Sequence, residues 1–160
     1  MSVLIIYDGK SGTTQKAANL LKEYLPQAET VDIKKLNHNL ASYDTVIIGS
    51  AIRMGNISKA TKNFIAANQA ELLQKKLGLF ICCGLPEKAA QQLADNFPAN
   101  LRQHAIATKS FGGEMNPDKL KGIDKFIAKT VIKERSKDPD APITKLDLNA
   151  IKEFAAQLAK

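Results

Sequence analysis

A run of glycine and hydroxyl residues follows the first apolar segment of the chain. The apolar residues 3–7 precede this loop, and a helical pattern follows it from Gln15. The loop itself consists of Gly9, Lys10, Ser11, Gly12, Thr13 and Thr14. A loop of this kind between a strand and a helix directs backbone N–H groups, the helix dipole and hydroxyl groups toward one point. The spacing predicts a phosphate site, and an ordinary strand-to-helix turn with a good N-cap is the alternative.

The loop matches neither of two common nucleotide-binding motifs. The triplet at positions 9–11 resembles the end of a P-loop, but that motif requires another glycine where this chain has Leu4. The dinucleotide-binding motif requires glycines at its third and sixth positions, which are Ser11 and Thr14 here. What remains is a site for a terminal phosphate monoester that is bound without a metal ion.

Two further loops are suited to hold a ligand. Residues 50–56 combine small residues, apolar side chains and a cation, which suits a flat aromatic ring better than a sugar. The candidate ligand-binding residues in this loop are Ala51, Ile52, Arg53, Met54 and Gly55. Residues 83–87 form the third loop, in which the candidates are Cys83 and Gly84. A phosphate together with a planar ring describes FMN.

The elements that must position these loops alternate between apolar strands and amphipathic helices. The strands are expected at residues 3–7, 30–33, 44–50, 77–83 and 105–111. The helices are expected at residues 15–25, from Ser58, at 88–97 and from Leu148 to Leu158. This alternation predicts an α/β fold with a doubly wound, five-stranded parallel sheet and helices on both faces. With the strand order 2-1-3-4-5 the three loops are neighbours.

Length and composition limit the class of protein. The chain has 160 residues, of which 44% are hydrophobic, which suits a single domain over residues 1–160. No apolar run is long enough to cross a bilayer and the start lacks the pattern of a secretory signal, so we expect a cytoplasmic protein. The formal charge of +7 and the pI of about 9.4 favour anionic partners.

The cysteine and histidine residues do not indicate a metal site. Cys82 and Cys83 are adjacent, so on a strand their side chains point to opposite faces, and we expect both to be reduced. His38 and His104 stand alone, without a cluster of other metal ligands.

A basic amphipathic helix is expected near residues 117–135, in addition to the elements of the sheet. Its lysines at four-residue spacing are Lys121, Lys125, Lys129 and Lys133. Two interpretations are open. The lysines contact an anionic membrane surface, at the inner face of the membrane, or a protein partner. Alternatively they form a solvated face of a helix packed over the sheet, which is the commoner case.

The loops and the strand order resemble those of flavodoxin. The first loop of flavodoxins reads Thr/Ser-x-Thr-Gly-x-Thr and holds the FMN phosphate, and this pattern falls on residues 9–14. Gly9 replaces a hydroxyl residue of the pattern, so one phosphate hydrogen bond is either lost or supplied by Lys10. The resemblance implies a flavodoxin-like fold and an FMN cofactor.

A closer resemblance is to the flavodoxin-type, menaquinone-dependent protoporphyrinogen oxidases. It rests on residues 46–55, above all on the sequence Ile-Arg-Met-Gly at 52–55, and on the segment after the last strand. The resemblance implies FMN-dependent oxidoreduction in heme biosynthesis, with a quinone or another redox partner. In those oxidases a long basic insertion follows the fourth strand, whereas here Cys83 leads through a short loop into a helix. This departure concerns the substrate and leaves the expected FMN site unchanged.

The residues on the ring side of the site each have more than one expected role. Arg53 would stabilise the reduced, anionic flavin and raise its potential, or orient an anionic substrate, or be a surface arginine. Ile52 and Met54 would pack on the flavin or anchor the loop. Cys83 would touch the flavin edge or be a buried structural thiol, which is the commoner case.

Two functions remain open and a third is disfavoured. The first is an FMN-dependent oxidoreductase, and the second is a small flavodoxin-type electron carrier without a substrate of its own. Flavodoxins are typically strongly acidic and this chain is basic, which favours the first. A signalling receiver domain needs an aspartate after the third strand, where this chain has Gly49 and Ser50. We expect no nucleic-acid partner, and the oligomeric state stays open.

Overall fold

The computed structural model of the chain describes residues 2–9, 12–113 and 146–160. These residues form a sheet of parallel strands in the order β2-β1-β3-β4-β5, which confirms the predicted topology. The strands are β1 (Val3–Asp8), β2 (Ala28–Asp32), β3 (Thr45–Ala51), β4 (Lys76–Cys82) and β5 (Ala107–Ser110).

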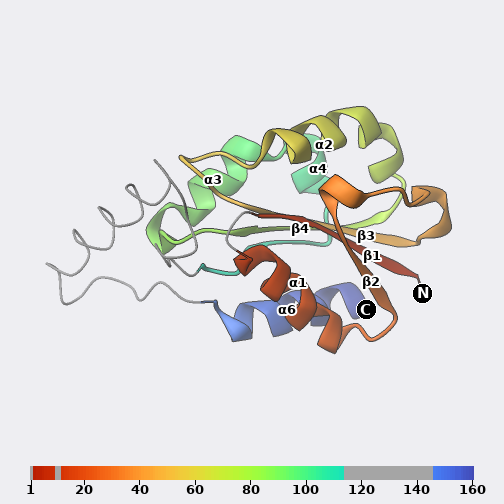
Figure 1. Ribbon diagram of the computed structural model, residues 1–160, viewed down its shortest axis with the longest axis horizontal. Helices are drawn as coiled ribbons and strands as arrows, with labels where there is room; N and C mark the ends of the chain where they lie inside the picture. Colours follow the sequence, from red (N-terminus) through yellow and green to blue (C-terminus); the bar gives the residue numbers. More distant parts are fainter. Residues whose placement is uncertain (1, 10–11, 114–145) are drawn as a thin grey trace, which may run out of the picture.

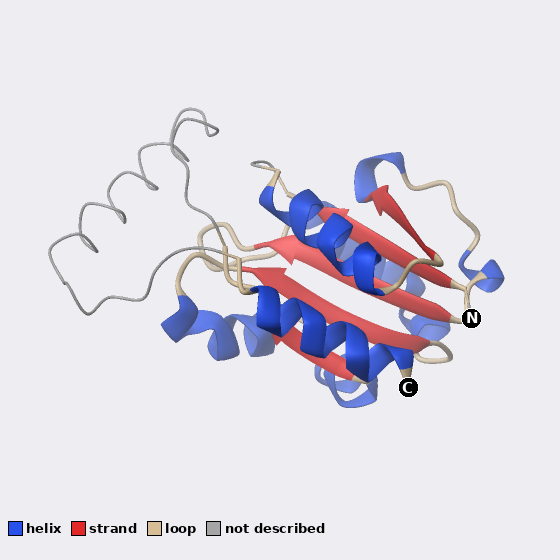
Figure 2. Cartoon of the chain, turned by 90° about the horizontal axis from the view of Figure 1, so that it is seen from below, coloured by secondary structure: helices blue, strands red, loops and turns tan. Residues whose placement is uncertain are grey.

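Helices cover both faces of the sheet (Figure 1). One face carries α1 (Thr13–Tyr24) and α6 (Leu148–Ala159), which Figure 2 shows side by side. The other face carries α2 (Lys59–Leu72), α3 (Ala89–Asn96) and α4 (Ala99–His104). Short 3-10 turns complete the described chain, namely η1 (Ile33–Lys35), η2 (Leu40–Ser42) and η3 (Pro86–Lys88).

The central strands are buried on both faces, as their almost unbroken apolar runs indicate. Alternate residues along each strand pack into two separate cores, one beneath α1 and α6 and one beneath the opposite helices. Cys82 belongs to the first core and Cys83 to the second. The prediction that these neighbours point to opposite faces is therefore confirmed, and their reduced state stays a prediction.

Some expected boundaries differ from the structure. β2 ends at Asp32, whose carboxylate accepts a hydrogen bond from the N–H of Lys34 and so caps η1. Helix α4 has no counterpart among the expected elements. It ends at His104, and β5 begins at Ala107, two residues later than expected. The closing helix begins at Leu148 as expected, but Leu148 is 59% exposed because it is the first residue of α6 and precedes the buried stripe.

The basic helix expected near residues 117–135 lies outside the described residues, together with Lys121, Lys125, Lys129 and Lys133. Over the ranges that are described, no helix combines the length and the apolar character that crossing a bilayer requires.

The strand register brings the three candidate loops to one edge of the sheet. Asp8 at the end of β1 lies beside Ser50 of β3, and Ala51 at the end of β3 lies beside Cys82 of β4. The connections leave β1 and β3 toward opposite faces, so this edge contains the topological switch point of the sheet. Ligands of open α/β sheets bind at such a point.

A cluster of three phenylalanines fixes the first core close to this edge. Phe80 stacks on Phe111 with ring centroids 4.5 Å apart, and the edge of Phe154 meets both rings. The Phe80 ring lies directly over Gly49, where an added Cβ would come within 1.9 Å of its Cζ atom. A side chain at position 49 is therefore incompatible with the cluster.

We predict that Gly49→Ala lowers the free energy of unfolding by about 1–3 kcal/mol, the usual cost of overpacking a core. The stacked Phe80 ring cannot retreat without losing its contacts with Phe111 and Phe154. Urea denaturation followed by far-UV circular dichroism measures the change. In the double variant Gly49→Ala/Phe80→Leu we expect the free energy of unfolding to fall by less than the sum of the decreases in the two single variants. Strict additivity would contradict the proposed clash.

Candidate functional site

Helix α1 begins at the candidate phosphate loop without a side chain to cap it. Its N-cap residue is Gly12, with a φ of 85° that favours glycine, whereas Ser58 and Asp147 cap α2 and α6 by accepting hydrogen bonds from N–H groups of the first turn. Gly12 cannot do this because it lacks a side chain. The first turn of α1 therefore presents backbone N–H groups and the positive end of the helix dipole to the edge of the sheet.

The hydroxyl group of Thr14 lies in the same turn. Thr14 is fully buried, and its Oγ1 has no hydrogen-bond partner among the described residues. A buried hydroxyl without a partner costs free energy, so such a group at a helix N-terminus indicates that a ligand supplies the missing bond. Thr13, beside it, is also buried.

Gly9 allows the chain to approach this hydroxyl closely. An added Cβ at Gly9 would lie 2.6 Å from Thr14 Oγ1 and 3.6 Å from the Cβ of Ala51. The departure from the flavodoxin pattern at this position thus has a steric reason in this chain. Lys10 and Ser11 lie outside the described residues, so their predicted contacts with the phosphate stay predictions.

The loop after β3 is a tight turn that carries Arg53 and Met54. The backbone N–H of Arg53 donates to the carbonyl of Asn56 at 2.9 Å, and the N–H of Asn56 donates back at 3.0 Å. The two residues between them have positive φ angles, 52° at Met54 and 79° at Gly55, as in a type I′ turn. Glycine adopts this conformation freely, but methionine does so at a cost.

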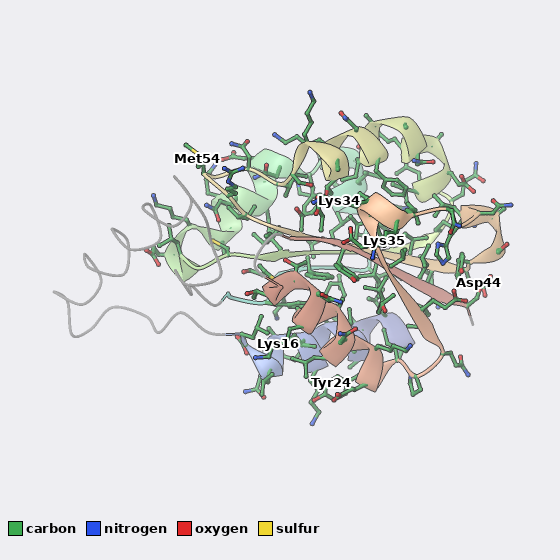
Figure 3. The ribbon with its side chains drawn as sticks, viewed as in Figure 1. Lys16, Tyr24, Lys34, Lys35, Asp44 and Met54 are labelled. Carbon is green, nitrogen blue, oxygen red and sulfur yellow. The ribbon has the colours of Figure 1, made fainter. Side chains whose placement is uncertain are left out.

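Met54 and Arg53 are exposed at the rim of the site. Figure 3 shows Met54 at the outer tip of its loop, at the opposite end of the sheet from Asp44. Met54 is 71% exposed and Arg53 is exposed as well, whereas Ile52 is half-buried and packs against the second core. An exposed apolar side chain and a cation therefore stand side by side next to the switch point.

Two buried side chains anchor this loop. Ser50 Oγ accepts a hydrogen bond from the N–H of Ser58 at 3.3 Å and so joins the two ends of the loop. The amide of Asn96, at the end of α3, bonds to the backbone of Gly55 and of Ile57. The sequence reasoning missed Asn96, and its spacing of four residues from Gln92, which is also buried, was the only local signal that could have revealed it.

The loop after β4 is short, and its backbone is packed against residues 112 and 113. Only residues 83–85 separate the end of β4 from η3. The N–H of Cys83 donates to the carbonyl of Gly112, and an added Cβ at Gly113 would come within 3.1 Å of the backbone of Cys83 and Gly84. The Cys83 thiol is buried and donates to Gln92 Oε1. The assignment of Cys83 and Gly84 to the cofactor stays a prediction.

The end of β1 contributes two titratable residues that the sequence reasoning did not select. The carboxyl group of Asp8 is buried at the switch point. Partial burial and, less strongly, the negative charge of Asp32 raise the pKa of the Tyr7 hydroxyl, so Tyr7 is neutral at physiological pH. No group of three or more potential metal ligands occurs among the residues that the structure describes.

Comparison with known proteins identifies the family. The family model described as "Flavodoxin domain" matches residues 4–141, which is most of the chain. The chain belongs to the flavodoxin family. FMN is the cofactor that the resemblance to flavodoxins implied, and at the level of the family that prediction is confirmed.

The relatives share the fold with low sequence identity. Protoporphyrinogen IX dehydrogenase (quinone) of Escherichia coli strain K12 is 23% identical over 172 residues, which cover 99% of this chain and 95% of the enzyme. A short-chain flavodoxin associated with a bacterial microcompartment has a TM-score of 0.60 at 12% identity, covering 99% and 97% of the two chains. Rubredoxin oxygen:oxidoreductase of Desulfovibrio gigas has a TM-score of 0.52 at 18% identity, and the match covers 99% of this chain but 37% of that one.

The described residues fit the phosphate of FMN. The first turn of α1 and the Thr14 hydroxyl, which no described side chain caps or pairs, are donors that face the same edge, and Gly9 places no side chain beside them. A phosphate monoester would satisfy these donors in the way that helix N-termini bind anions. The loops that begin at Ile52 and at Cys83 flank this position on the side where the ring of FMN would lie.

The strained turn generates a prediction about stability. We expect Met54→Asn to raise the free energy of unfolding by about 1 kcal/mol, because asparagine tolerates a positive φ better than methionine does. Met54→Leu is the matched control, since it keeps both the apolar side chain and the backbone strain, and its stability should equal that of the wild type. Urea denaturation of both variants makes the comparison. A loss of stability in Met54→Asn would show that side-chain contacts outweigh the strain.

Proposed function

We propose that this protein binds FMN at the switch point and acts as an oxidoreductase that passes electrons from a reduced substrate to a quinone. The observation that carries the cofactor part is the fully buried Thr14 hydroxyl at the start of α1, which has no hydrogen-bond partner within the part of the chain that the structure describes. The similarity to protoporphyrinogen IX dehydrogenase over nearly the whole of both chains supports the redox class.

The residues of this chain bind and orient the cofactor. Bound FMN would supply the electron or hydride transfer. The first turn of α1 and Thr14 hold the phosphate, and the loops after β3 and β4 hold the ring. Arg53 is the charged residue at the ring side, where a cation stabilises negative charge on a reduced ring or orients an anionic substrate. This chemistry requires no general acid or base from the protein.

The surface charge favours an enzyme over a flavodoxin-type carrier. A carrier that docks on basic partners presents an acidic surface. This chain has 23 Lys and Arg residues against 16 Asp and Glu residues. A quinone or an acidic redox protein is therefore the partner that we propose. Contact with an anionic membrane surface through Lys121, Lys125, Lys129 and Lys133 stays a prediction, because these residues lie outside the described part of the chain.

One observation favours the electron carrier as the second candidate. The basic insertion expected after the fourth strand of the related oxidases is absent here, where three residues join β4 to η3. If that insertion recognises the substrate, this chain lacks the means to bind a porphyrinogen. The two candidates share the FMN site and differ in what reaches its rim.

The FMN site is tested by Thr14→Val, which removes the hydroxyl and keeps the shape of the side chain. We expect the affinity for FMN to fall by about ten- to a hundredfold, the range for a hydrogen bond to a charged group. The affinity for riboflavin, which has no phosphate, should be unchanged. Quenching of flavin fluorescence on titration measures both constants.

Thr45→Val is the matched control for this experiment. Thr45 Oγ1 is also buried without a partner among the described residues, but Thr45 is the first residue of β3, whereas the candidate site lies at the end of that strand. Its replacement should leave both affinities unchanged. Equal losses of FMN and riboflavin affinity in Thr14→Val would place the phosphate elsewhere, and a wild-type protein that does not quench FMN fluorescence would refute the proposed function.

The two candidate functions are separated by turnover. With FMN bound, we expect the protein to oxidise protoporphyrinogen when a menaquinone analogue is the acceptor, as measured by the fluorescence of the porphyrin product. Omission of the quinone under anaerobic conditions is the control. Absence of turnover by an FMN-loaded protein would favour the electron carrier.

A further inference from the structure

Helix α3 places a row of polar side chains against the sheet, where apolar side chains would be expected. Gln92 and Asn96 are one turn apart on its inner face and are 7% and 9% exposed. Cys83, 2% exposed, adjoins them at the end of β4. Polar groups at this depth are retained where hydrogen bonds compensate for the lost water, so the partners of these groups show what they do.

The amide of Asn96 bonds to the turn at residues 53–56 and to the residue that follows it. Its Nδ2 group donates to the carbonyl of Gly55 at 2.9 Å, and its Oδ1 atom accepts from the N–H of Ile57 at 3.0 Å. The same Nδ2 group donates to the carbonyl of Gln92 at 2.8 Å, which ties the side chain to its own helix. One side chain therefore connects α3 to a loop about forty residues earlier in the sequence.

Gln92 continues this connection to the loop after β4. Its Oε1 atom accepts from the Cys83 thiol, and the Cys83 sulfur accepts from the N–H of Leu85 at 3.4 Å. The row Cys83, Gln92 and Asn96 thus links the loop after β4 with the loop after β3. These are the two loops that flank the ring side of the candidate site.

We infer that Asn96 is a positioning residue of the flavin site, which holds the Arg53–Asn56 turn in place and, through Gln92 and Cys83, in a constant relation to the loop after β4. The inference rests on the proposed function. The turn needs such support because Met54 adopts a positive φ, a conformation that persists only where surrounding contacts enforce it. Asn96 itself is buried, and we infer that it acts through the turn.

A purely structural role for Asn96 would give a different result from a positioning role. The matched control is Asn68→Ala. Asn68 also donates its Nδ2 group to a carbonyl four residues earlier in its helix, that of Phe64 at 2.9 Å, but it lies in the second half of α2. Both Asn68→Ala and Asn96→Ala thus lose an intrahelical bond, and only Asn96→Ala also loses bonds to the turn.

The first experiment uses the protein without flavin. In Asn96→Ala we expect hydrogen exchange at the N–H groups of Asn56 and Ile57 to accelerate by about tenfold or more, because the bond from Ile57 to Asn96 is lost and the turn opens locally. Exchange within β4 should be unchanged, and Asn68→Ala should leave the turn as protected as in the wild type. Unchanged protection of the turn in Asn96→Ala would overturn the inference, whether or not FMN binds.

The second experiment uses FMN and riboflavin. In Asn96→Ala we expect both affinities to fall by the same factor of about ten, equivalent to one or two net hydrogen bonds, because the ring side is affected and the phosphate side is not. The visible circular dichroism and the midpoint potential of the saturated FMN complex should also change. These two readouts do not respond to a uniform loss of stability.

A second variant and two further outcomes distinguish a positioning role of Asn96 from a structural one. Asn96→Leu, which is close in size and loses the bond from Ile57 as well as both donated bonds, serves if Asn96→Ala does not fold, and the same changes are expected from it. A dichroism spectrum and a potential identical to those of the wild type, with lower thermal stability alone, would reduce Asn96 to a structural role. Failure of the wild type to bind FMN would refute the proposed function, while the exchange experiment would still report on the turn.

Discussion

The hydrogen-bond ladder of a parallel sheet stops where its strands stop, and the backbone of each loop beyond that edge must find other partners. In this protein side chains supply those partners at two of the three loops. Ser50 and Asn96 bond to the loop after β3, and the Cys83 sulfur bonds to the loop after β4. At the remaining loop, which follows β1, the first turn of α1 starts at a glycine, and the buried Thr14 hydroxyl beside it has no partner among the described residues. The candidate site is the part of the edge where these groups leave donors for a ligand.

The fold could be predicted, and the candidate phosphate loop could be selected, because their signals are local. Unbroken apolar runs mark strands that are covered on both faces, and glycine and hydroxyl residues between a strand and a helix mark an anion site. Gly12 and Thr14 carry that signal through their types and spacing alone. Even the vicinal cysteines followed from the alternation of side chains along a strand.

The ring side could be predicted only in part, because it depends on contacts between distant segments. The partners of Asn96 are backbone groups at positions 55 and 57, and no periodicity within α3 indicates a bond across that separation. An apolar residue would serve the helix equally well at that position, so local patterning favours the wrong type. The paired positive φ angles at Met54 and Gly55 could not be predicted either, since methionine is not among the residues that are typical of such a turn.

The two sides of the candidate site therefore differ in structure: one presents backbone groups at the start of a helix, and the other is a turn held by buried side chains. The candidate phosphate side presents backbone N–H groups at the start of α1, and many sequences can provide such donors. The ring side uses a braced turn whose exposed residues, Arg53 and Met54, can change without disturbing the bracing side chains beneath them. The pattern of the family's phosphate loop therefore does not by itself determine the substrate or the partner.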